Sequence, residues 1–183
     1  MAFLGIRVPH EVGRLIRNLE VPGEKETPSE YHITLLVFED NWSIKKMLKA
    51  TEAAYEIMAE TEPFSVKADH VSHFPPRPDH PVPIIAPVKS EELHQLHKKL
   101  VKALQAAKVD FKQTFKEYKP HITLAYSPHG YDDYKMDTPL QFMVQEAVLW
   151  GGDEGDTKLF TTLPIESARE KEARSAVESD RSI

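Results

Sequence analysis

The chain has 183 residues, of which 40% are hydrophobic and 28% are charged, a composition typical of a globular protein with one substantial domain or two small lobes that share a core. Its 29 acidic and 23 basic residues give a formal net charge of -6, which argues against a protein that binds long nucleic acids through bulk electrostatics. There is no cysteine, so disulfide scaffolds, thiol catalysis and cysteine-ligated metal sites are excluded.

The sequence contains no apolar stretch that approaches the roughly 18 to 20 residues needed to cross a bilayer. Its first residues also lack the basic start and the small-residue cleavage site of a secretory signal peptide. We therefore expect a soluble, cytoplasmic chain without a membrane partner.

The first part of the chain alternates strand and helix patterns. Three segments are predicted to be strands, residues 2–8, 31–38 and 64–71. A helix is expected over 11–19, with an apolar stripe made of Val12, Leu15, Ile16 and Leu19. A second helix is expected from the N-cap Ser43 to residue 60, and its predicted inner face consists of Ile44, Met47, Leu48, Thr51, Ala54, Tyr55 and Met58. Loops are predicted over 22–28 and over the proline-rich residues 74–81.

The second part repeats this order. Residues 82–88 predict a strand, Ser90 is the expected N-cap of a helix with a leucine stripe, and residues 119–124 predict another strand. Residues 141–150 and 158–165 flank a glycine-rich turn and are typical of a closing hairpin. The remaining residues, 166–183, are mostly Ala, Ser and charged residues and indicate a charged tail without a core of its own.

One tetrapeptide, His-Ile-Thr-Leu, occurs twice, at residues 32–35 and 121–124. Each copy ends a strand–helix–strand unit, so the repeat predicts two related lobes that face each other across a pseudo-twofold axis. Because neither lobe has much core alone, we expect them to form one cooperative domain.

Within each repeat, alternation along a strand puts the histidine and the threonine on one face and the two aliphatic residues on the other. A single His-x-Thr is adequately explained by a buried histidine beside a residue that strands favour. Two of them facing one cleft supply what phosphodiester cleavage without a metal needs. One neutral imidazole can remove a proton, a protonated one can supply a proton, and the hydroxyls can donate hydrogen bonds to phosphate oxygens.

The segments 31–35 and 119–125 resemble the two motifs of the 2H phosphoesterase superfamily, which includes the LigT or 2′-5′ RNA ligase-like proteins and cyclic phosphodiesterases. The resemblance covers residues 1–165, and it implies an α+β fold of two pseudo-symmetric lobes, each an antiparallel sheet with outer helices, around a central cleft. It further implies metal-independent chemistry without a cofactor. His32 and His121 would be the acid/base pair, and Thr34 and Thr123 would bind the phosphate.

The second motif is followed by Tyr126, where many bacterial relatives have an arginine that can help to hold the phosphate. We consider Tyr126, Phe3 and Phe74 candidate substrate-binding residues, and Arg7 a partial replacement for the missing cation. The alternative for Arg7 is a surface ion pair. Trp150 is a further candidate for base stacking, but the favoured interpretation is a core residue.

Several other histidines could suggest a metal site. His94 and His97 are three residues apart on a predicted helix, but no third ligand accompanies them, so we expect them on a solvated helix face. His70, His73 and His80 surround the proline-rich loop and are expected at its rim.

These observations predict a metal-independent phosphodiesterase acting on a small nucleotide or oligonucleotide, functioning as a monomer without structured nucleic acid as a partner. The cleaved linkage could be a 2′,3′-cyclic phosphate, a 2′-5′ linkage or a cyclic oligonucleotide. One alternative role is the phage-type destruction of cyclic oligonucleotide immune signals. A second alternative is a non-catalytic module that sequesters a nucleotide, and a third is 2′-5′ RNA joining by the same site.

Overall fold

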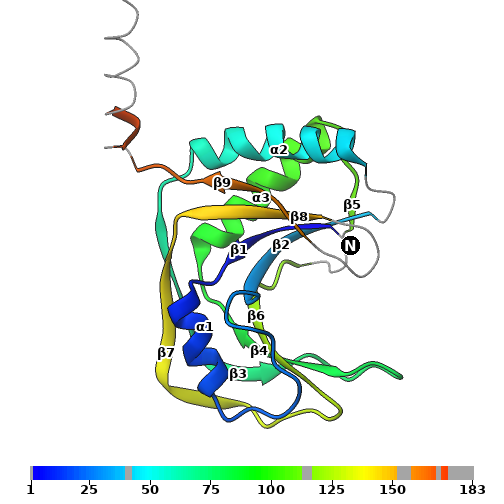
Figure 1. The fold of residues 1–183 in the computed structure, drawn as a ribbon, viewed down its shortest axis with the longest axis vertical. Helices are drawn as coiled ribbons and strands as arrows, with labels where there is room; N and C mark the ends of the chain where they lie inside the picture. Colours follow the sequence, from blue (N-terminus) through cyan, green and yellow to red (C-terminus); the bar gives the residue numbers. More distant parts are fainter. Residues whose placement is uncertain (1, 40–42, 113–116, 152–157, 168–169, 173–183) are drawn as a thin grey trace, which may run out of the picture.

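The computed structural model describes residues 2–39, 43–112, 117–151, 158–167 and 170–172. Its strands follow one path through the sheet, in the order β7-β3-β4-β6-β2-β1-β8-β9, with the short strand β5 on β2. All of these strand pairs are antiparallel, and helices follow the first, second and fourth strands along the chain (Figure 1). The predicted α+β class is confirmed.

The sheet divides into two halves where β2 meets β6. The first half-sheet contains β1 (Phe3–Arg7), β2 (His32–Phe38), β5 (Phe111–Lys112), β8 (Glu146–Gly151) and β9 (Lys158–Pro164). The second half-sheet contains β3 (Phe64–His73), β4 (Val82–Pro87), β6 (His121–Ser127) and β7 (Tyr134–Val144). A single residue pair, Ile33 with Ile122, joins β2 to β6. The two strands that carry the repeated tetrapeptide are therefore neighbours at the centre of the molecule.

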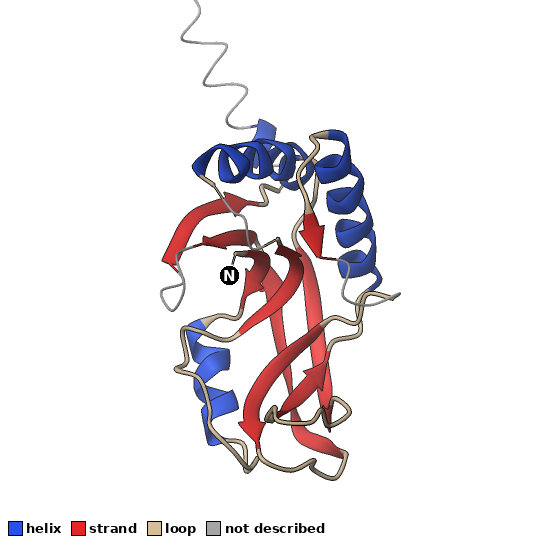
Figure 2. Cartoon of the chain, turned by 90° about the vertical axis from the view of Figure 1, so that its right-hand side faces the viewer, coloured by secondary structure: helices blue, strands red, loops and turns tan. Residues whose placement is uncertain are grey.

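The helices lie on the outside of the sheet (Figure 2). Helix α1 (His10–Asn18) follows β1 but packs beside β7 of the second half-sheet. Helices α2 (Ile44–Ala59) and α3 (Glu91–Ala106) pack against each other, and α2 also contacts β8 and β9 of the first half-sheet. Both predicted N-caps are confirmed, because the Ser43 hydroxyl accepts from the Lys46 amide and the Ser90 hydroxyl from the Leu93 amide.

The strand register repeats the internal duplication. Arg7 of β1 pairs with His32 of β2, and Pro87 of β4 pairs with His121 of β6. The two strand pairs then shift register at equivalent points, between Leu4 and Gly5 in one and between Ile84 and Ile85 in the other. The duplication is visible in the sequence as four identical residues. In the structure it extends to the register of the strand pairs and to the two register shifts.

Two predicted features are wrong in detail. The buried residues of α2 are Met47, Ala50, Ala54 and Met58, whereas Ile44 is 72% exposed and Leu48 is 57% exposed. The small residues Ala50 and Ala54 let α2 approach its neighbours closely, so the buried stripe is narrower and rotated from the predicted one. In α1, Leu15 is likewise exposed, while Val12 and Ile16 are buried.

The predicted strand 141–150 is in fact two strands. The end of β7 pairs with β3 in the second half-sheet, and β8 pairs with β1 in the first. Gln145 lies between them, and its carbonyl accepts a hydrogen bond from the Ile165 amide. The antiparallel pairing of β8 with β9 confirms the predicted hairpin, although its turn over 152–157 lies outside the described residues. Most of the predicted tail over 166–183 lies outside them as well.

Within the described part of the chain, no helix combines the length and the apolar character that crossing a membrane requires.

Candidate active site

Both repeated histidines line one cavity of about 560 Å³ between the two half-sheets. His32 comes from β2 and His121 from β6, and both side chains are half-buried. Thr34 and Thr123 line the same cavity, while Ile33 and Ile122 between them are fully buried. The structure therefore brings together the two imidazoles and two hydroxyls that the sequence predicted to share a cleft.

The two imidazole rings are oriented by the same local contact. The Nδ1 atom of His32 lies 2.8 Å from the carbonyl oxygen of Glu30, and that of His121 lies 2.7 Å from the carbonyl oxygen of Lys119. A carbonyl can only accept, so this geometry assigns the proton to Nδ1 in both rings. Nε2 of each ring is then the atom available to exchange a proton with a ligand.

Burial lowers the pKa of both imidazoles from the ordinary value of 6.5. The carbonyl hydrogen bond opposes this effect in each ring, and the charge of His32 lowers the pKa of His121 further. Both rings are therefore mainly neutral at pH 7 in the unliganded protein. A bound phosphate, being an anion, favours the protonated form of a neighbouring ring.

A β-bulge in each central strand brings a further residue into the cavity. Leu35 in β2 and Leu124 in β6 are the extra residues at the two register shifts, and each reverses the alternation of the side chains that follow. Val37 and Tyr126 consequently line the cavity, although strict alternation would bury them. Gly5 lies opposite the first bulge, where a Cβ would come within 2.8 Å of the Ile33 carbonyl oxygen.

Aromatic rings form one wall of the cavity. Phe3 stacks on Trp150 with ring centroids 4.7 Å apart, and the ring of His32 lies 4.7 Å from that of Phe3. The prediction that Trp150 is a core residue is wrong. Its pairing with Phe3 in the β1–β8 register places it on the cavity face, half-buried. Phe74 meets His121 edge to face at 4.7 Å.

Three of the four predicted substrate-binding residues line the cavity, and Arg7 does not. Phe3, Phe74 and Tyr126 all line the cavity, as predicted. Burial raises the pKa of the Tyr126 phenol, with Glu26 adding to the effect, so it remains a hydrogen-bond donor at neutral pH. Arg7 pairs with His32 across β1 and β2 but is not among the residues that line the cavity.

The loop between α1 and β2 supplies residues that sequence reasoning missed. Glu26 and Glu30 line the cavity from this loop. The loop is fixed to β6 by two backbone hydrogen bonds between Glu24 and Tyr126, of 2.9 and 2.8 Å. Gly23 makes this approach possible, because its φ is +102° and a Cβ there would lie 2.2 Å from the Tyr126 carbonyl oxygen. The turn composition of the loop was visible in the sequence, but its path to β6 was not.

No group of three or more His, Asp or Glu side chains suited to a metal ion occurs among the described residues. The expectation that His94 and His97 lie on a solvated face is wrong for His97, whose ring stacks on Tyr118 at 4.1 Å and 3°. The half-buried His94 meets the same tyrosine ring edge to face at 5.5 Å. His73 and Asp133 form an ion pair of 3.8 Å when His73 is protonated, near the proline-rich loop.

The fold and the paired motif together define a bilobal protein with two histidines in one interlobe cavity. The chain belongs to the 2′-5′ RNA ligase superfamily, whose family model matches residues 14–156. The resemblance inferred from the two motifs is thereby confirmed.

Individual proteins are similar to the chain in sequence or in fold. A Bacillus subtilis (strain 168) protein named RNA 2′,3′-cyclic phosphodiesterase is 31% identical over 116 residues, which span 62% of this chain and 61% of the relative. TT0787 of Thermus thermophilus has the same fold, with a TM-score of 0.73 and 16% identity over 91% of this chain and 98% of that one. E. coli LigT, solved in complex with 3′-AMP, matches with a TM-score of 0.70 and 18% identity, also over 91% and 98%.

Proposed function

We propose that the chain is a phosphodiesterase that opens 2′,3′-cyclic phosphates at the end of a nucleotide or RNA, using His32 and His121 as an acid/base pair and no metal. The observation that carries the proposal is the matched placement of the two rings. Both share one cavity with two threonines, and both have Nδ1 on a backbone carbonyl. The family assignment and the name of the B. subtilis relative support the choice of reaction.

In the proposed reaction, a water oxygen attacks the phosphorus while the neutral imidazole accepts a proton from that water at Nε2. The bond from phosphorus to one ribose oxygen breaks, and the protonated imidazole donates its Nε2 proton to that oxygen. The product is a ribose phosphate monoester beside a free hydroxyl. Exchange of protons with solvent then restores one neutral and one protonated ring.

The threonines complete this scheme. The described residues that line the cavity include no lysine or arginine, so the charge that builds on the non-bridging oxygens has to be balanced by other groups. The hydroxyls of Thr34 and Thr123 can donate hydrogen bonds to those oxygens, and the imidazolium supplies the positive charge. Thr123 also interacts with the Tyr126 hydroxyl, so Tyr126 can reach the same phosphate.

The nucleoside would bind against the aromatic wall. Phe3 and Trp150 offer a stacked pair of rings beside His32, and stacking tolerates any base. Glu26 and Glu30 can accept hydrogen bonds from ribose hydroxyls or base amino groups.

The test is a product screen in EDTA. Adenosine 2′,3′-cyclic phosphate, a 2′-5′ adenylate dimer and a cyclic dinucleotide are each incubated with the protein, and the products are resolved by mass. The proposal expects ring opening of the first compound with the gain of one water. Cleavage of the cyclic dinucleotide alone would favour the signal-degrading role. A bound but unchanged ligand in every case would favour the sequestering module.

A further inference from the structure

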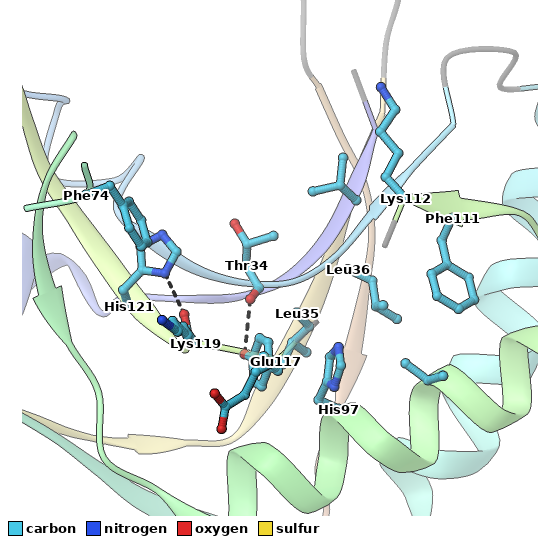
Figure 3. A pocket seen from close by; sticks show the side chains of 13 residues that line it. Thr34, Leu35, Leu36, Phe74, His97, Phe111, Lys112, Glu117, Lys119 and His121 are labelled. Atoms are coloured by element: carbon cyan, nitrogen blue, oxygen red, sulfur yellow. Dashed lines mark hydrogen bonds between the residues drawn. The ribbon is translucent and has the colours of Figure 1, made fainter. Parts of the chain in front are cut away.

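A second cavity, which we call the side cavity, opens beside the proposed catalytic one. It has a volume of about 440 Å³ and shares Thr34, Val37, Phe74 and His121 with its larger neighbour. Figure 3 shows Phe74 and His121 on one side of it, Lys112 and Phe111 on the other, and His97 of α3 below. The two cavities therefore meet at the residues that would hold the scissile phosphate.

The walls of the side cavity suit a flat, largely apolar ring. Leu36, Val101 and Phe111 supply aliphatic and aromatic surface. The stacked rings of His97 and Tyr118 extend this surface, and burial lowers the pKa of His97, so its ring is mainly neutral at pH 7. The volume lies within the range of about 300 to 1,000 Å³ that small-molecule sites occupy.

The two cavities differ in charge. Glu26 and Glu30 line the catalytic cavity, whereas Lys112 and Lys119 line the side cavity together with one carboxylate, Glu117. Lys112 is held on β5 by its pairing with Val37, at the wall common to both cavities. A second phosphate joined to the substrate is therefore accommodated better in the side cavity, beside the lysines, than in the catalytic cavity, beside the two glutamates.

We propose that the side cavity binds the second nucleoside of an oligonucleotide that ends in a 2′,3′-cyclic phosphate, with Lys112 and Lys119 balancing the phosphate that joins the two nucleosides. This inference rests on the proposed function and narrows its substrate class. The terminal nucleoside occupies the aromatic wall, the cyclic phosphate lies between the imidazoles, and the chain continues toward its 5′ side through the side cavity. A mononucleotide leaves the side cavity unfilled.

The experiment compares kcat/KM for adenosine 2′,3′-cyclic phosphate with kcat/KM for the adenylate dinucleotide that ends in the same cyclic phosphate. We expect the dinucleotide to be preferred by about tenfold or more, since one stacked base contributes about that factor. Val101→Trp fills the side cavity and should remove most of this preference. Lys112→Gln should reduce it by about fivefold, because one charge pair is lost in a partly screened position. The salt dependence of the preference should weaken in the same variant.

Two matched controls lie on the exposed face of α3. Lys102→Gln removes a charge and Gln105→Trp adds a bulky ring, and both should keep the full preference of the unchanged protein. Melting temperatures show whether Val101→Trp is folded, and Lys112→Gln tests the same cavity without a packing change.

Equal kcat/KM values for the two substrates would overturn the inference while the proposed function stands. So would a preference that survives both Val101→Trp and Lys112→Gln. Failure to open either substrate would instead overturn the proposed function itself.

Discussion

Replacing either proposed imidazole by alanine should separate catalysis from stability. General acid or base catalysis by one positioned group contributes about 10²- to 10⁴-fold in rate, so His32→Ala and His121→Ala should each lower kcat/KM by that amount. This corresponds to about 3 to 5 kcal/mol of transition-state stabilisation. Because the two groups act in one step, the double variant should lose much less than the product of the two single losses.

The structure indicates a small effect of the same changes on folding. Each ring is half-buried, and its described hydrogen bond is to a backbone carbonyl two residues earlier in the chain. Losing one such bond costs about 1 kcal/mol. For a chain of this length, that lowers the melting temperature by about 2 to 4 °C.

The assay is single-turnover ring opening of adenosine 2′,3′-cyclic phosphate, followed by chromatography, with melting curves measured on the same preparations. His10→Ala is the matched control, since His10 is an exposed histidine at the start of α1 and should keep full activity. Full activity in His121→Ala would refute the reasoning. So would a rate loss accompanied by unfolding at the assay temperature, because the loss would then report on structure alone.

Three further predictions follow from particular contacts. Burial holds the pKa of both proposed catalytic rings below 6.5, so kcat/KM should peak below pH 6.5 and fall at higher pH as the imidazolium that acts as the acid is lost. A maximum above pH 7.5 would contradict this assignment. Tyr118→Phe removes the hydroxyl that donates a hydrogen bond to the Thr34 carbonyl at 3.1 Å, so it should lower kcat severalfold and the free energy of unfolding by about 1 kcal/mol. An effect on unfolding alone would show that Tyr118 does not position Thr34. Gly23→Ala should lower the free energy of unfolding by about 1 to 3 kcal/mol in urea titrations, because φ is +102° and the new Cβ would meet the Tyr126 carbonyl. An unchanged midpoint would refute the close approach of the Gly23 backbone to that carbonyl.

The central part of the fold could be predicted because its sequence signals are local. Ser43 and Ser90 precede apolar helical stripes, and both cap the helices that follow. The two copies of His-Ile-Thr-Leu show duplication directly, and alternation within them correctly separates the cavity-lining residues from the buried ones. These signals depend on a few neighbouring residues and on strand geometry alone.

Other features depend on contacts between distant segments, which no local pattern contains. Trp150 faces the cavity because β8 pairs with β1 in a register that sets it opposite Phe3. His97 is covered because Tyr118, in the connection that precedes β6, stacks on it. The exposed apolar residues of α2 misled the periodicity argument, since apolar residues occur on more than one face of that helix and only packing selects the buried one.

The bulges explain how a symmetric scaffold produces an asymmetric site. Phosphodiester cleavage by two imidazoles needs one ring as the acid and the other as the base, and the duplicated register supplies two rings in matching positions. Beyond each bulge the matching positions hold different residues: Val37 in β2 corresponds to Tyr126 in β6. Their paired neighbours differ as well, with Phe3 on β1 and Pro83 on β4. Since all four line the cavity, its walls offer a stacking surface on one side and a hydroxyl donor on the other. In the proposed function, the matched rings act on the phosphate while the unmatched residues fix the direction in which the nucleotide lies.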